Sequence, residues 1–172
     1  MGLDATAYGR LTLVENPVLD EDGYPEGGSQ RSFWENPDFP GRMAGIEGRP
    51  AVYEYEVTAD FFHGGYGRYN GVRELLAKLA GYPAIEVEQY GQKYQRHDEG
   101  AFRAGAGPFY EMICFSDCEG TIGPVACAKL AADFAAHQTE ADAHENEYFR
   151  SCYAMWRAGF ELAADGGAVH FH

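Results

Sequence analysis

The stretch PFYEMICFSDCEGTIGPVACAKLAADF, from Pro108 to Phe134, decides the expected fold of this chain. Its first eight residues, Pro108 to Phe115, are almost all apolar, which is typical of a strand buried on both faces at the centre of a sheet. A helix is expected from Pro124 to about residue 138, because proline suits the first helical position and apolar residues follow at helical spacing. The acidic turn between them follows a predicted strand end, where ligand sites of sheet proteins often lie.

The flanking sequence adds further elements. Alternation of apolar and polar residues predicts strands at 7–15, 51–57, 84–90 and 168–172. Apolar residues at helical spacing, followed by glycines that end each segment, predict helices at 66–80 and 141–164. Two segments are expected to be irregular: a proline- and glycine-rich excursion at 16–50, pinned onto the body by its aromatic residues, and a polar loop at 91–107.

These elements predict an α+β fold in one domain, 1–172. We expect a mixed or antiparallel sheet of about four to five strands and three main helices, at about 66–80, 124–138 and 141–164. A chain of 172 residues with 45% hydrophobic content is long enough for one sizeable core and too short to favour two.

The charge and cysteine content narrow the expected partners. With 27 acidic against 13 basic residues and a net charge of −14, the surface should repel phosphate backbones, so we expect no direct binding of nucleic acid. No apolar run approaches the roughly 20 residues that span a bilayer, and no secretion signal is recognisable, so we expect no membrane association. The four cysteines lack paired spacing, which favours reduced thiols and a cytoplasmic location.

The turn Ser116, Asp117, Cys118, Glu119 admits three interpretations. In the simplest, its side chains hydrogen-bond to backbone amides and no ligand is needed. A calcium loop of the EF-hand type is disfavoured, since Ala126 stands where a bidentate glutamate is required. A Cys118 nucleophile is disfavoured by the carboxylates on either side, which oppose the thiolate.

A second candidate is HGGYGRYNG, from His63 to Gly71, a glycine-rich helix start. Backbone amides at such a start can hold a phosphate or carboxylate with help from arginine, although simple turn formation and packing also explain the residues. The residues that we expect to bind a ligand are Tyr66, Arg68, Tyr69, Asn70 and Arg73 of the helix start and Ser116, Asp117, Cys118 and Glu119 of the turn.

The histidines His170 and His172 point to the same face of the last strand. With Asp117 or Glu119 they could ligate a metal, but fraying of an exposed chain end is the simpler expectation. We therefore expect no metal and no cofactor.

Several segments together resemble a family of small uncharacterised proteins of tailed phages and prophages. They include the start MGLDATAYGRLT, the G-x-Y-x-x-[FY]-N motif that contains Gly65, Tyr66, Tyr69 and Asn70, the S-D-C-[DE]-G motif at Ser116 to Gly120, and the terminal Phe171-His172. The resemblance implies an accessory protein in the cytoplasm of a bacterial host and implies no particular activity. Val72 departs from the family pattern, which usually has an aromatic residue there.

Three classes of function stay open. We favour a non-catalytic binder of a small polar or nucleotide-like ligand, with counter-defence as one role open to it. The helix start, the acidic turn and the 16–50 excursion would line one pocket. The alternatives are a metal- or thiol-dependent hydrolase and an acidic inhibitor that binds a host protein or mimics a duplex. The hydrophobic face of the 141–164 helix suits a homo-oligomer as well as a core.

Overall fold

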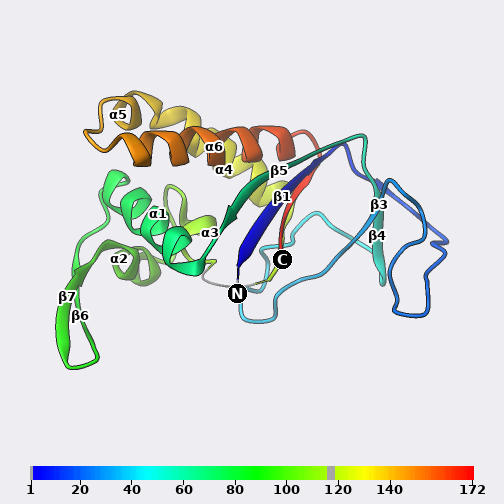
Figure 1. Cartoon of the computed structure of the whole chain (residues 1–172), viewed down its shortest axis with the longest axis horizontal. Coiled ribbons are helices and arrows are strands. Elements are labelled where there is room, and N and C mark those ends of the chain that lie inside the picture. Colours follow the sequence, from blue (N-terminus) through cyan, green and yellow to red (C-terminus); the bar gives the residue numbers. More distant parts are fainter. Residues whose placement is uncertain (1, 116–118) are drawn as a thin grey trace.

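The computed structural model describes residues 2–115 and 119–172 and confirms the α+β class (Figure 1). Its main sheet contains four antiparallel strands in the order β5-β1-β9-β8. The strands are β1 Leu3–Gly9, β5 Val57–Gly64, β8 Gly120–Ile122 and β9 Ala168–Phe171. The final strand of the chain is therefore central, between β1 and β8, and all four of its residues are buried.

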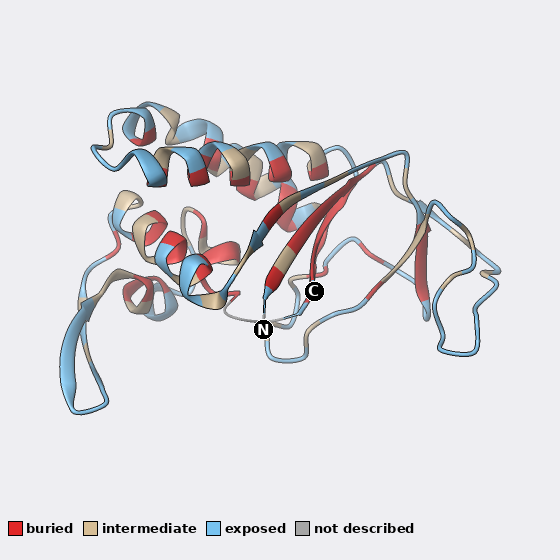
Figure 2. Ribbon diagram, in the orientation of Figure 1, coloured by how far each residue is buried: buried red, intermediate tan, exposed pale blue. Residues whose placement is uncertain are grey.

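Helices cover one face of this sheet (Figures 1 and 2). The long ones are α1 Tyr66–Leu79, α4 Pro124–Ala136 and α6 Glu147–Ala163. Their apolar stripes pack with the sheet around Trp156, whose ring lies 5.9 Å from that of Phe171 in β9. No helix in the described part of the chain is long and apolar enough to cross a membrane.

The prediction of one helix at 141–164 is wrong about where that helix begins. The chain forms a short α5 Gln138–Asp142, turns, and begins α6 at Glu147. The Asn146 side chain accepts a hydrogen bond from the amide of Phe149 and so caps α6. A side-chain cap of this kind satisfies an amide that the helix itself leaves free, which fixes where the helix begins.

The apolar run Pro108 to Phe115 is not a strand. It forms the short helix α3 Tyr110–Ile113, entered through Phe109 in the left-handed conformation (φ 57°). Asp133 of α4 accepts a hydrogen bond from the Phe109 amide at 2.7 Å, so a distant carboxylate holds this turn. A short, uniformly apolar run cannot be assigned by periodicity, because buried strands and buried helical turns look alike.

The strand expected at 7–15 begins earlier and is split. After β1, Arg10 adopts a positive φ of 55°, and β2 Thr12–Leu13 joins a second sheet. The strand expected at 51–57 is likewise two strands, β4 Ala51–Glu54 and β5, and β5 continues to Gly64 beyond the predicted end. The chain therefore changes sheets at both points.

The polar loop expected at 91–107 is also wrong. The predicted strand β6 Ile85–Gln89 pairs with β7 Gln92–Arg96, and the helix α2 His97–Ala104 follows at once. The hairpin projects away from the body (Figure 1). Glu74 of α1 accepts hydrogen bonds from the amides of His97 and Asp98. The N-terminus of α2 is therefore capped by a side chain from another helix.

The 16–50 excursion is mostly irregular but contributes β3 Gln30–Phe33. A small antiparallel sheet, β2-β4-β3, lies beside the main sheet (Figure 1). A second core forms where it meets the main sheet, made up of Tyr8, Phe33, Met43, Ile46, Ala51, Tyr53 and Ala168. The excursion is therefore packed, and it covers part of the sheet face that the helices leave open.

Candidate functional site

The predicted helix start uses two of its polar residues for packing. Tyr69 is fully buried, and its hydroxyl donates to the carbonyl oxygens of Phe115, at 2.8 Å, and Met112, at 3.1 Å. Arg73 is 3% exposed and donates to the carbonyl of Ile113 and the side chain of Asn70. These bonds fasten α1 to the end of α3, at residues Met112, Ile113 and Phe115.

Of the other three predicted residues, Asn70 is half-buried and accepts from Arg73, whereas Arg68 and Tyr66 lie at the surface. Arg68 is exposed, donates to the Tyr148 hydroxyl, and stacks over the rings of Tyr148 and Phe62 at 5.3 and 5.6 Å. Tyr66 is half-buried at the edge of the core. Neither residue lines any of the hollows described below.

Of the acidic turn, Ser116, Asp117 and Cys118 lie outside the described residues. Glu119 is exposed, and its carbonyl accepts a hydrogen bond from the Asn36 side chain at 2.8 Å. The structure therefore tests neither the calcium nor the nucleophile interpretation of the turn itself.

The other cysteines are buried thiols. Cys114, Cys127 and Cys152 are free and buried. Burial raises the pKa of Cys114 to about 11 and that of Cys127 to about 12. A thiol with so high a pKa is almost entirely protonated near neutrality and is a poor nucleophile.

The C-terminal histidines are held within the sheet instead of fraying. His170 is fully buried, with Nδ1 3.1 Å from the Thr121 hydroxyl and its ring 4.2 Å from that of Trp34. His172 is exposed, and its Nε2 lies 3.0 Å from the Thr6 hydroxyl. No three His, Cys, Asp or Glu residues within 2–115 and 119–172 already surround a point where a metal could sit.

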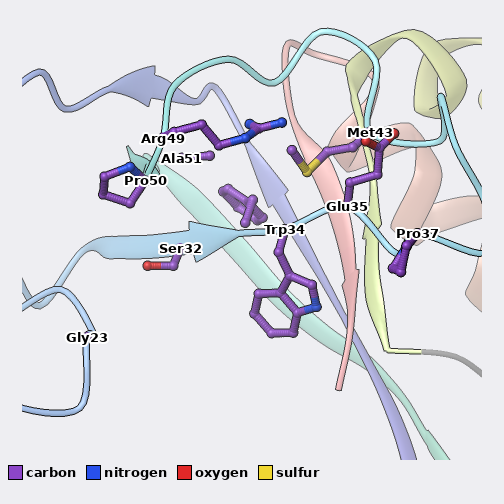
Figure 3. A pocket seen from close by; sticks show the side chains of 10 residues that line it. Gly23, Ser32, Trp34, Glu35, Pro37, Met43, Arg49, Pro50 and Ala51 are labelled. Atoms are coloured by element: carbon purple, nitrogen blue, oxygen red, sulfur yellow. The ribbon is translucent and has the colours of Figure 1, made fainter.

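Two adjoining hollows lie around Trp34 at the end of β3. The larger, of about 510 Å³, extends toward Met43 and Arg49, and the smaller, of about 260 Å³, lies beside Tyr24 and Arg31. Figure 3 shows the Trp34 indole on one side of β3 and Met43 and Arg49 on the other. Trp34 is 40% exposed and Tyr24 61% exposed, so both rings are accessible to a ligand.

Polar atoms near Trp34 lack partners. Arg31 Nε, Ser32 Oγ and His170 Nε2 are buried without a hydrogen-bond partner among the described residues. Leaving a buried donor or acceptor unpaired costs about 1–3 kcal/mol, so such atoms usually have a partner in the functional state. Ser32 lines both hollows, and Arg31 lines the smaller one.

A third hollow, of about 460 Å³, lies between α1 and the β6–β7 hairpin and includes Asn70 and Arg73. Phe102, 40% exposed, lines its wall. Its second arginine, Arg96, pairs with Asp98 at 2.5 Å, so that cation is already neutralised. Two predicted ligand residues thus meet in a hollow, but Arg73 already donates from Nε to the Ile113 carbonyl and from Nη1 to the Asn70 side-chain oxygen.

The sequence analysis missed the roles of Tyr24, Arg31, Ser32 and Arg49. Gln30–Phe33 is three polar residues followed by one apolar residue, so it lacks the alternation that would have identified a strand inside the excursion. Comparison of the chain with models of known protein families, with curated proteins and with solved structures found no match in any of the three.

Proposed function

We propose that this protein is a non-catalytic binder of a small, planar, polar ligand of the nucleotide kind, held in the hollows around Trp34. The observation that carries the proposal is the meeting of two exposed rings, Tyr24 and Trp34, with the unpartnered polar atoms of Arg31 and Ser32. Ligand sites typically combine apolar and aromatic walls with a few polar groups that fix orientation.

The two hollows suit different parts of such a ligand. A planar ring fits the smaller hollow, where it can contact the Tyr24 and Trp34 rings and bond to Ser32. An attached anionic group would extend toward Arg49, which makes no ion pair within the described ranges. Glu35 also lines the larger hollow, and its carboxylate accepts from the Gly41 amide, so it disfavours a highly charged tail.

The biological setting belongs to the same proposal. The resemblance of the sequence motifs to tailed-phage proteins supports an accessory protein in the cytoplasm of a bacterial host, where it would lower the free concentration of its ligand. Mass spectrometry of the small molecules released on denaturing protein purified from bacterial cells tests this directly. A planar anionic compound in about stoichiometric amount is expected.

The location is tested by titrating the protein with a panel of nucleoside monophosphates, with affinity read by calorimetry. Loss of a ring that stacks on a base costs about 1–3 kcal/mol, so Trp34→Ala should weaken binding roughly 5- to 150-fold. Phe102→Ala is the matched control, because Phe102 is equally exposed but lies in the hollow beside α1. Loss of binding in Phe102→Ala alone would move the site to α1, and absence of both released ligand and binding would overturn the proposal.

A further inference from the structure

The face of the main sheet that the helices leave open carries a histidine pair. His170 of β9 and His172, directly after the strand, flank the buried Phe171, and their rings lie within 16° of parallel with centroids 5.7 Å apart. Across the sheet, His170 is paired with Thr6 of β1 on one side and Thr121 of β8 on the other. The pair is therefore fixed by a central strand with neighbours on both sides.

The hydrogen bonds of His172 define its tautomer. The Thr6 hydroxyl donates to Asp60 Oδ1 at 2.6 Å, so its oxygen is left to accept from His172 Nε2 at 3.0 Å. Neutral His172 therefore carries its proton on Nε2, and Nδ1 keeps a free lone pair. A carboxylate–hydroxyl–imidazole chain of this kind orients the ring and fixes its tautomer.

His170 provides a second, independent indication of a ligand. It is fully buried and contacts Thr121 through Nδ1, but its Nε2 has no partner in the described part of the chain. An imidazole nitrogen that has no hydrogen-bond partner can bind a metal ion through its lone pair.

We propose that His170 and His172 form a two-histidine site for a divalent transition metal ion such as Cu²⁺, Ni²⁺ or Zn²⁺. Imidazole nitrogens suit these ions, and a ring separation of 5.7 Å leaves room for one ion at about 2.1 Å from a nitrogen of each ring. Extending the β8–β9 register by one residue places Glu119 opposite His172, so its exposed carboxylate is the natural third ligand. Glu119 need only turn its exposed side chain to complete the site.

The surrounding charges act in both directions. Arg31 is close enough to influence His170 and opposes a bound cation. Asp60, joined to His172 through Thr6, and Asp4, which bonds to His63 at 3.1 Å, favour one. The carboxylates lie on the same open face of the sheet, so the site should accept a cation in spite of Arg31.

Trp34 supplies a reporter for the test. Its ring lies 4.2 Å from that of His170, whereas Trp156 lies in the core on the other side of the sheet. Untagged full-length protein is titrated with CuCl₂ and, separately, NiCl₂, with calorimetry and tryptophan fluorescence read in parallel. One equivalent is expected to bind, and Cu²⁺ should quench the Trp34 emission; Trp34→Phe should remove the quenching and keep the calorimetric binding.

The variants separate this site from other histidines. Thr6→Val removes the hydroxyl that orients His172 and should weaken metal binding about 10- to 100-fold. His172→Ala removes a ligand itself and should weaken metal binding at least tenfold. His63→Ala, an exposed histidine beside a carboxylate, is the matched control and should bind as the wild type does. Arg31→Gln should bind more tightly. Unchanged binding in His172→Ala, or equal loss in His63→Ala, would overturn the proposal; His172 is exposed, so its replacement leaves the fold intact.

Discussion

Replacing Tyr69 with phenylalanine decides whether the helix start of α1 is structural or binds ligand. The substitution removes only a hydroxyl that is buried and donates to two carbonyl oxygens. Met112 O keeps a second donor, the Phe115 amide at 3.1 Å, so the main loss falls on Phe115 O, which the Tyr69 hydroxyl reaches at 2.8 Å. Depriving one buried carbonyl of a donor costs about 1–3 kcal/mol.

A loss of about 2 kcal/mol corresponds to a decrease in Tm of roughly 4–8 °C for a chain of this size. Urea unfolding, followed by far-ultraviolet circular dichroism, measures the loss in the free energy of unfolding. Tyr66→Phe is the control, since Tyr66 is half-buried and no hydrogen bond of its hydroxyl is found among the described residues, so its change should stay within about 0.5 kcal/mol. Affinity for nucleoside monophosphates should not change in either variant. A Tyr69→Phe protein of normal stability that no longer binds ligand would refute this reasoning and restore the helix start as the site.

Other expected outcomes follow from single positions. Gly71→Ala should raise the free energy of unfolding by about 0.5–1 kcal/mol, because Gly71 lies within α1 and an added Cβ meets nothing within 4 Å. Gly100→Ala should lower it by more than 1 kcal/mol, since the Cβ would lie 2.1 Å from the Pro83 carbonyl oxygen. His170 should take up a proton in the unfolded chain but not in the folded one as the pH falls from 6.5 to 5.5. Wild-type stability should therefore decrease across that interval by about 1 kcal/mol more than that of His170→Gln, as measured by urea unfolding at both pH values. Cys127 should resist alkylation in native protein and react only after unfolding, as peptide mapping would show.

The elements that could be predicted from the sequence are those whose signal is local. Helix α1 has a regular apolar stripe and a glycine after its end, and it was placed to within one residue. The final strand β9 shows clean alternation and was also predicted correctly. What could not be predicted is that β9 is central, because pairing depends on β1 and β8, which lie far away in the sequence.

The run at 108–115 fails for a different physical reason. Its apolar composition reports burial but not conformation, and the partners that satisfy its backbone are distant. Tyr69, Arg73 and Asp133 contact this segment from α1 and α4 through side-chain bonds to its backbone groups. The turn also satisfies some of its own amides, since those of Ile113 and Cys114 donate to the carbonyls of Phe109 and Tyr110. A strand and a helical turn can both satisfy a buried backbone, so the apolar composition does not distinguish them.

The candidate site exists because the open face of the main sheet is only partly covered. An antiparallel sheet normally leaves one face to water, and polar residues such as Thr6, Thr121 and His170 fit that expectation. Here the excursion returns through β3 and lays Phe33 and Trp34 over this face, which buries the polar residues without pairing them all. Phe33 completes a second core, whereas Trp34 stays 40% exposed beside two hollows. The same few residues that stabilise the excursion therefore create both accessible ring surface and unsatisfied nitrogen and oxygen atoms, a combination that a packed core excludes and a binding site needs.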